Sequence, residues 1–274
     1  FTLAFFVATA MNFGGIIVIV LIVAAGIFAI IRSQKKFAQK QKELVQQGDM
    51  LFTQMWHVTD RTLIIPMLER HIHMSVAGVL EDFAKLWTET ADALKEENLK
   101  TLRHTQRELT QSKRTLKNLR RREALCLRRA EPALTAVKLS TPFHLIHNSL
   151  LQIRYGLVRM AEPCLEHVDN NFNPMPQAYV DEFIPICNAV DKFLEETHRL
   201  ITSGNFNGVD EVLVEGNAIK SRISQIRHEQ QDRIQRDEQN LKIDLLYLST
   251  LQETQEIISI TRHLLRASKR FQTQ

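Results

Sequence analysis

The sequence predicts an all-α protein in which the end of a transmembrane helical hairpin is followed by a cytoplasmic antiparallel helix bundle. The first 31 of the 274 residues carry no charged side chain, so all 35 basic and 31 acidic residues come after them. Beyond residue 37, apolar residues recur at helical spacing. Glycine and proline are sparse there, and no segment alternates apolar and polar residues for long enough to predict a strand.

The uncharged N-terminus predicts membrane insertion, because a charge near the bilayer centre costs roughly 2.5–3.5 kcal/mol. Residues 12–15 (Asn-Phe-Gly-Gly) interrupt the apolar run. As a helix, residues 15–31 would span about 26 Å of a ~30 Å hydrocarbon core, whereas residues 1–11 are too short to cross. We therefore predict a transmembrane hairpin over residues 1–33 with a truncated first helix, and we expect the chain to be a fragment of a larger membrane protein.

Basic residues follow the apolar run and predict its orientation. No small-residue cleavage site stands there and no basic region precedes the run, which argues against a secretory signal peptide. The positive-inside rule places the exit side in the cytoplasm, with residues 34–61 as a juxtamembrane helical connector. The cluster at the membrane exit consists of Arg32, Lys35, Lys36, Lys40 and Lys42.

Seven helices are predicted after the membrane segment. Glu96–Asn98 marks a hairpin, and Gly204 is placed to end a helix. Pro132 and Pro142 bound a short linker, from which Thr141 would cap a helix that starts at Pro142. The predicted helices lie near residues 43–59, 62–95, 99–131, 142–169, 177–203, 208–237 and 240–271. Residues 62–274 form the predicted bundle domain.

An internal repeat is visible at an offset of 107 residues. Residues 83–94 align with residues 190–201, so that Thr90 meets Thr197, and the next helices stay in phase, with Leu116 over Ile223. A true repeat predicts two three-helix units related by a pseudo-twofold axis. The alternative is that any two amphipathic hairpins can be aligned in this way.

Few residues suggest chemistry. The chain has no Walker loop, no G-x-G-x-x-G and no nucleophile elbow, so we predict no catalytic residue, no cofactor and no enzyme activity. His144 and His147 are three residues apart on a predicted helix, and His71 and His73 should point in different directions. Residues 166–169 (Glu-His-Val-Asp) hold ligand-type side chains, but polar surface residues explain these groups better than a metal site does. The three cysteines, widely spaced and without C-x-x-C, predict reduced buried thiols.

The predicted helix 99–131 is strongly basic, with eleven Lys and Arg against two acids over residues 100–129. Such a surface could bind phosphate-bearing ligands or the anionic inner leaflet. The alternative is a solvated face whose charge is balanced by the acidic helices over residues 181–215. Nucleic acid is excluded as a partner because the domain is tethered to a membrane. The candidate residues for an anionic-ligand or lipid surface are Arg120, Arg121, Arg122, Arg128 and Arg129.

Two segments carry a resemblance to a known family. They are residues 163–172 (Pro-Cys-Leu-Glu-His-Val-Asp-Asn-Asn-Phe) and residues 245–271, which begin Leu-Leu-Tyr-Leu-Ser-Thr. The chain resembles the C-terminal part of bacterial inorganic phosphate transporters of the PiT permease family that end in a PhoU-like cytoplasmic domain. PhoU-like domains are two pseudo-symmetric three-helix bundles, as the repeat predicts. Their metal motifs, E/D-x-x-x-D, occur only in looser forms such as Asp191-x-x-x-Glu195 and Asp92-x-x-x-Glu96, so no metal site is predicted.

The resemblance implies cation-coupled transport of inorganic phosphate, with Na⁺ or H⁺ as the coupling ion. The family's transport signatures do not occur in these residues, so no substrate residue can be assigned. We expect the chain to supply the last membrane helices and a regulatory domain of a multi-pass protein in the bacterial inner membrane. Its other expected partner is the lipid bilayer, and a homo-oligomer is left open. The alternative function is a membrane-anchored helical signalling protein without transport activity, for which His147-Asn148 is the suggestive feature.

Overall fold

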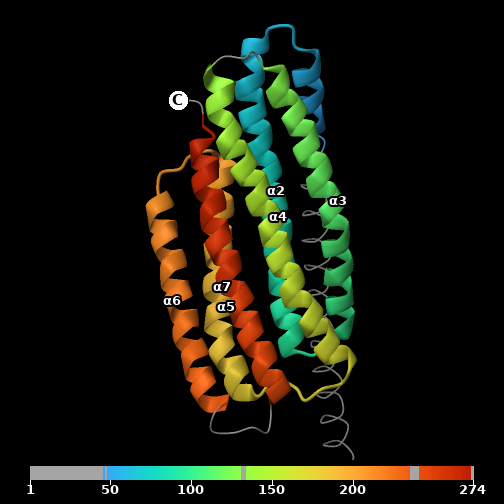
Figure 1. Cartoon of the computed structure of the whole chain (residues 1–274), viewed down its shortest axis with the longest axis vertical. Coiled ribbons are helices and arrows are strands. Elements are labelled where there is room, and N and C mark those ends of the chain that lie inside the picture. Colours follow the sequence, from blue (N-terminus) through green and yellow to red (C-terminus); the bar gives the residue numbers. More distant parts are fainter. Residues whose placement is uncertain (1–45, 47, 131–133, 235–240, 273–274) are drawn as a thin grey trace, which may run out of the picture. The chain divides into compact units, whose positions relative to one another are not determined.

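The computed structural model describes residues 46, 48–130, 134–234 and 241–272. A short helix covers residues 48–57, and a one-turn 3-10 helix, η1, covers Arg61–Leu63. The long helices are α2 (Ile64–Lys95), α3 (Leu99–Arg129), α4 (Leu134–Asp169), α5 (Gln177–Ser203), α6 (Val209–Ile234) and α7 (Leu241–Arg270) (Figure 1). The described residues contain no strand, which confirms the all-α prediction. The predicted hairpin over residues 1–33 lies outside them.

One compact unit runs from Met50 to Gln274. It therefore begins at Met50 rather than at residue 62, where the sequence placed the start of the bundle. The additional residues pack onto the bundle because Met55 is buried and Phe52 and Val58 contact the core.

The six long helices form two three-helix units, α2–α3–α4 and α5–α6–α7. The units meet where α2 packs on α5 and α4 packs on α7, and α4 and α7 lie side by side in Figure 1. Both pairs run antiparallel. Along α2 and α5, His73 lies by Gly204 and Thr88 contacts Asp191. Along α4 and α7, Gly156 lies by Ile257 and Cys164 contacts Thr250. A pseudo-twofold axis that exchanges α2 with α5 and α4 with α7 explains this pairing.

The packing agrees with the 107-residue repeat. Thr90 and Thr197 are both fully buried, and each hydroxyl donates to the carbonyl four residues earlier, at 2.7 and 2.8 Å. Leu116 and Ile223 are buried at equivalent places on α3 and α6. Such local back-bonding satisfies a hydroxyl in an apolar interface, because buried polar groups need a partner.

A single hydrophobic core runs through both units. Each helix contributes an apolar stripe, and burying the stripes supplies the main favourable free energy, about 25 cal/mol per Å² of apolar surface. The largest fully buried side chains include Trp87, Phe143, Phe183, Phe193 and Tyr247.

Helix α4 differs from its prediction. It begins at Leu134 and runs through Pro142, which the sequence placed at the first position of the helix. A proline inside a helix removes one backbone hydrogen bond and is unfavourable locally. The burial of Leu139 and Phe143 on the core side of α4 offsets that cost. Thr141 is therefore a residue within the helix and not its cap.

Two other breaks were predicted correctly, whereas the predicted breaks at Pro132 and between residues 237 and 240 lie outside the described residues. The side chain of Asn98 accepts a 3.1 Å hydrogen bond from the Thr101 amide and caps α3. Gly204 ends α5 in the left-handed region, with φ of 64°, which glycine adopts without steric cost.

Among the described residues, one helical stretch, Arg61–Lys95, has the length and mean hydropathy of a membrane span. Its most apolar window has a mean hydropathy of 1.2, and 44% of that window is buried inside the bundle. A core helix passes the same test, so this stretch is weak evidence for membrane insertion.

Glycine at residue 156 allows the close approach of α4 and α7. A Cβ at this position would lie 2.8 Å from Cγ1 of Ile257. We predict that Gly156→Leu destabilises the protein by about 1–3 kcal/mol, because the extra side chain overpacks the interface. The measurement is a chemical denaturation curve of the full chain in detergent.

The matched control is Gly78→Ala in α2, where a Cβ meets nothing within 4 Å, so the control should gain about 0.5–1 kcal/mol. A Gly156→Leu midpoint at or above that of the parent would contradict this packing.

Candidate functional site

A buried carboxylate joins the three helices of the first unit. Glu123 on α3 is 0% exposed. Its Oε1 lies 2.9 Å from Nδ1 of His71 on α2 and accepts a 2.7 Å hydrogen bond from the Ser75 hydroxyl. Its Oε2 lies 2.8 Å from Nε2 of His147 on α4, a close ion-pair contact in which the ring N–H is not aligned for an ideal hydrogen bond.

The surroundings favour the charged form of Glu123. Burial alone would raise the pKa of this carboxyl, but the close polar contacts and positive charge of His147 and His71 reverse that effect and lower it to about 2. A buried charge is tolerated only when partners satisfy it, so the three side chains depend on one another.

The structure shows where the four histidines named in the sequence analysis lie. His71 and His73 do point in different directions, since the ring of His73 lies 5.7 Å from that of Phe206. His144 and His147 do not share an environment, because His144 is exposed and His147 is buried. The sequence analysis missed Glu123 as their partner. A signal was present: Glu123 continues the seven-residue series of Leu102, Leu109 and Leu116 along the buried stripe.

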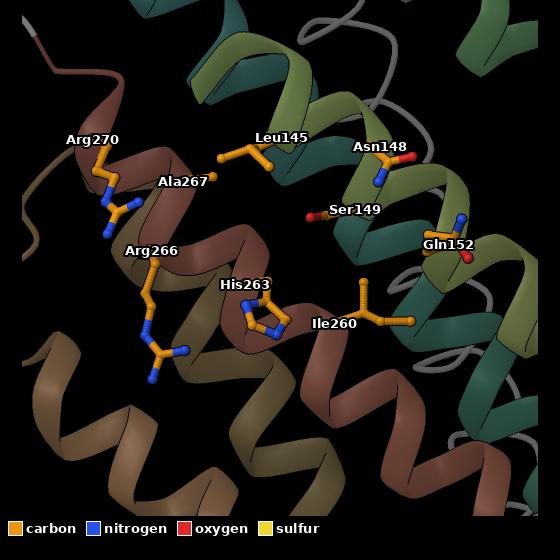
Figure 2. A pocket seen from close by; sticks show the side chains of 9 residues that line it. All are labelled: Leu145, Asn148, Ser149, Gln152, Ile260, His263, Arg266, Ala267 and Arg270. Carbon is orange, nitrogen blue, oxygen red and sulfur yellow. The ribbon is translucent and has the colours of Figure 1, made fainter. Parts of the chain in front are cut away.

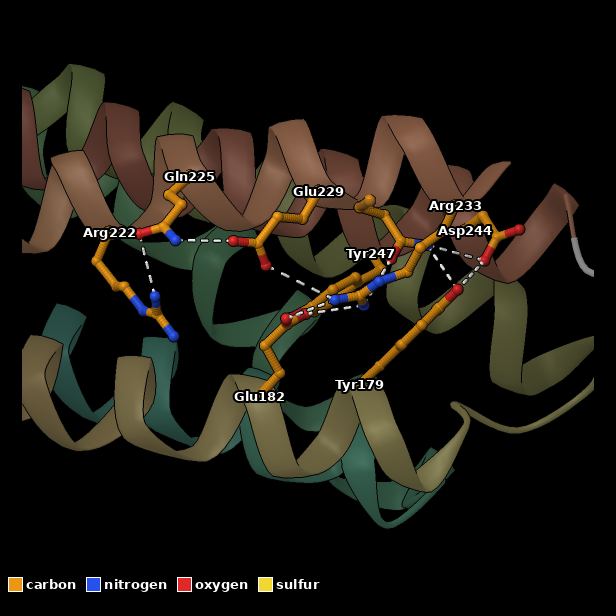
Figure 3. Close-up of polar contacts among 9 residues, drawn as sticks. Tyr179, Glu182, Arg222, Gln225, Glu229, Arg233, Asp244 and Tyr247 are labelled. Carbon is orange, nitrogen blue, oxygen red and sulfur yellow. Dashed lines mark hydrogen bonds and ion pairs between the residues drawn. The ribbon is translucent and has the colours of Figure 1, made fainter. Parts of the chain in front are cut away.

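The second unit has its own buried polar cluster (Figure 3). Gln230 on α6 is 0% exposed, and its amide donates to Oδ1 of Asp244 on α7 at 3.1 Å and to the hydroxyl of Tyr179 on α5 at 2.6 Å. Tyr179 in turn donates to the same Asp244 oxygen at 2.7 Å. This network therefore joins all three helices of the unit.

A second layer of contacts surrounds that network. Arg233 on α6 contacts both carboxylate oxygens of Glu182 on α5, at 2.9 and 3.3 Å. The hydroxyl of Tyr247 donates to Glu182 at 3.2 Å, and its ring stacks on Tyr179 with centroids 5.0 Å apart. Burial, together with the Glu182 carboxylate, raises the pKa of Tyr247, so the phenol stays a donor.

The two clusters occupy equivalent positions in the repeat. Glu123 and Gln230 are separated by the same 107-residue offset, and each lies fully buried on the middle helix of its unit. One unit uses a charged side chain and the other a neutral amide for the same task of joining both neighbouring helices.

The five arginines that were predicted to form a basic surface on α3 fall into two groups in the structure. Arg120, Arg121 and Arg128 are exposed and remain candidates for an anionic partner. They do not face the acidic residues 181–215, because α3 packs on α2 and α4. Another basic residue of α3, Arg103, forms an ion pair with Asp169 at the end of α4, at 2.6 Å.

Arg122 and Arg129, also predicted for this surface, contact the segment before α2. The guanidinium of Arg122 lies 4.3 Å from the ring centroid of Phe52, and that of Arg129 lies 5.3 Å from Trp56. Arg129 also donates to the carbonyls of Met55 and Val58, both at 3.3 Å. These two arginines fix the segment before α2 onto α3 through cation–π contacts and hydrogen bonds. The membrane-exit cluster, residues 32–42, lies outside the described residues.

The residues of the Glu-His-Val-Asp string stabilise the end of α4. His167 Nε2 lies 2.9 Å from the carbonyl of Asn173 in the following loop, and Asp169 pairs with Arg103. The neighbouring ring of Phe172 lies 3.8 Å from the ammonium of Lys242. These contacts join the α4–α5 loop to α3 and α7.

The loose acidic motifs do not converge on a metal-binding group. Asp191 accepts a 2.7 Å hydrogen bond from Thr88, and Asp92 pairs with Lys95 at 2.8 Å. Burial, and to a lesser degree the charge of Asp92, raise the pKa of Asp191 against the opposing hydrogen bond from Thr88. Over the residues that the structure describes, no three His, Cys, Asp or Glu side chains are gathered to hold a metal ion.

The three cysteines are free and buried, as predicted. Burial raises the pKa of the Cys126 thiol to about 11 and those of Cys164 and Cys187 to about 12. Because the thiolate is the reactive form, these thiols are unreactive in the folded protein.

A groove of about 450 Å³ lies between α4 and α7, where the two units meet (Figure 2). Helix α4 contributes Leu145, Asn148, Ser149 and Gln152, and α7 contributes Ile260, His263, Arg266, Ala267 and Arg270. Figure 2 shows Arg266 and Arg270 near the C-terminal end of α7, and Ile260 and Gln152 at the opposite end of the groove. The sequence analysis did not single out these residues, because they come together only when α4 and α7 pack.

We predict that Glu123→Gln lowers the free energy of unfolding at pH 7 by about 3 kcal/mol, because it removes the charge that both histidines contact. The pKa of Glu123 is about 2 in the folded protein against an ordinary value of 4.5. Its contribution is therefore fully present above pH 4.5 and is lost as the pH falls toward 2. Denaturation curves between pH 7 and pH 3 should show the variant and the parent converging. If the difference in unfolding free energy between the variant and the parent stayed constant across that range, Glu123 would not be ionised in the folded protein.

Comparison with known proteins identifies the fold. No protein-family model matches the chain, and no curated protein matches its sequence. The structure is similar to the crystal structure of PhoU from Pseudomonas aeruginosa, with a TM-score of 0.60 and 13% sequence identity. The match covers 73% of this chain and 93% of that one. At this identity the likeness shows the fold alone: the described bundle is a PhoU-like helical domain.

Proposed function

We propose that this chain is the regulatory end of a cation-coupled inorganic phosphate permease in the bacterial inner membrane. One observation carries the proposal. A PhoU-like bundle of two three-helix units follows an uncharged segment of 31 residues in the same chain. The uncharged segment would supply the last membrane helices, and the bundle would act in the cytoplasm on transport by the rest of the protein.

The arrangement of the bundle supports a regulatory role. Its buried polar side chains contact one another across helices, as Glu123 does with His71 and His147, which suits a stable scaffold. We propose no catalytic role for them. Inorganic phosphate and Na⁺ or H⁺ would be handled by the upstream part of the permease, and the bundle would pair with that part or with a second copy.

The alternative is a membrane-anchored signalling protein without transport activity. His147-Asn148 suggested this alternative, since phosphotransfer needs a histidine that a phosphate donor can reach. His147 is 5% exposed, and its Nε2 faces Glu123. The structure therefore weakens the phosphotransfer version of the alternative, and the uptake experiment below separates a regulator without transport from a permease.

Uptake of labelled phosphate tests the proposal. The natural reading frame that contains this chain is expressed in a bacterium that lacks its own phosphate transporters. We expect uptake that collapses when the Na⁺ or H⁺ gradient is removed. A second version, truncated after residue 49, removes the bundle and should keep uptake but lose its response to the phosphate status of the cell. If the whole protein supports no phosphate uptake, the proposed permease activity is overturned and the signalling protein without transport activity is favoured. An unchanged response after truncation would overturn the regulatory role.

The orientation has a separate test. The native cysteines do not suit it because they are buried, so the reporter is Ser221→Cys on the exposed face of α6. An impermeant maleimide should leave this cysteine unlabelled in intact spheroplasts and label it once the membrane is permeabilised. The parent protein, with its three buried thiols, is the control and should stay unlabelled in both conditions. Labelling of intact spheroplasts would place the bundle outside the cytoplasm.

A further inference from the structure

The groove between α4 and α7 has a strongly positive lining. Arg266 and Arg270 are one helical turn apart, and His263 lies one turn before Arg266 on the same side of α7. No Asp or Glu is among the groove's lining residues.

Ion pairs within the described part of the chain do not involve these two guanidinium groups. Within the part of the chain that the structure describes, neither Arg266 nor Arg270 has a carboxylate within ion-pair distance, unlike Arg159, which is 2.8 Å from Glu253 on α7. The negative end of the helix dipole favours basic residues in the last turn of α7. That effect explains their position along the helix, but it does not require them to line a groove with polar groups from α4.

The rest of the groove supplies complementary chemistry. Asn148 and Gln152 on α4 offer amide donors, with Gln152 at the end of the groove away from the arginines, and Ser149 adds a hydroxyl. Leu145 and Ile260 offer apolar surface. A volume of about 450 Å³ falls in the range of sites for small organic ligands, roughly 300–1,000 Å³, and is larger than one phosphate ion needs.

We propose that this groove binds a small organic diphosphate or triphosphate, of the size of a nucleotide, between the two three-helix units. Arg266 and Arg270 contact adjacent phosphate groups, because side chains one turn apart are separated by about 5–6 Å. Guanidinium groups bind phosphate oxygens through paired, charge-assisted hydrogen bonds. Asn148, Gln152 and the apolar residues hold the organic part. Because α4 and α7 belong to different units, a bound ligand would stabilise their junction.

Binding of ADP to the full chain tests the proposal, with the chain in phosphatidylcholine nanodiscs and titration followed by calorimetry. We expect ADP to bind, and we expect the double variant Arg266→Gln/Arg270→Gln to bind it at least about tenfold more weakly. AMP should bind more weakly than ADP, because it has one phosphate for two arginines. The matched control is Lys113→Gln/Lys117→Gln on α3, which removes two exposed cations one turn apart and should bind ADP as the parent does.

Two further measurements distinguish an organic diphosphate from inorganic phosphate and from the phosphate group of a lipid. Inorganic phosphate should bind more weakly than ADP, and nanodiscs that contain phosphatidic acid should leave the affinity for ADP unchanged. No binding of ADP, equal binding by the Arg266/Arg270 variant, or an equal loss in the lysine control would overturn the proposal. The proposal of an organic diphosphate or triphosphate would also be overturned if inorganic phosphate bound preferentially, or if phosphatidic acid alone bound through these arginines. The titration involves no transport, so its outcome is independent of the uptake experiment.

Discussion

The buried charge of Glu123 is the constraint on which the first three-helix unit depends. A carboxylate that is 0% exposed persists only if partners satisfy it, and here those partners come from both neighbouring helices. The register of α3 against α2 and α4 is therefore specified by a polar contact as well as by apolar packing. Hydrophobic stripes alone tolerate sliding, whereas a buried ion pair in the wrong register leaves an uncompensated charge.

The second unit solves the same problem with a neutral side chain at the equivalent position of its middle helix. Gln230 occupies the position equivalent to Glu123 and joins α5 to α7 through Tyr179 and Asp244. The shared position and different chemistry are what an internal repeat with diverged halves would produce. The charged cluster makes the first unit sensitive to acid, while the amide of Gln230 does not titrate.

At the junction of the two units, α4 and α7 line a groove in which Arg266 and Arg270 have no carboxylate partner among the described residues. The opposite side of the first unit is used differently, since Arg122 and Arg129 on α3 hold the segment that enters the bundle. Basic residues therefore serve two purposes on one scaffold. Some attach the entering chain, and others remain available to a ligand or a surface.

The sequence by itself determined the helical class, the breaks at Asn98 and Gly204, and the repeat, because these follow from local spacing and capping chemistry. It also indicated the basic character of α3. Only the tertiary structure decided that α4 continues through Pro142, since burial of neighbouring residues outweighs a local backbone cost. Only the tertiary structure brought His71, Glu123 and His147 together, and assembled the groove from α4 and α7. Contacts between residues distant in sequence depend on which helix faces meet, and apolar periodicity indicates that a face is buried without indicating its partner.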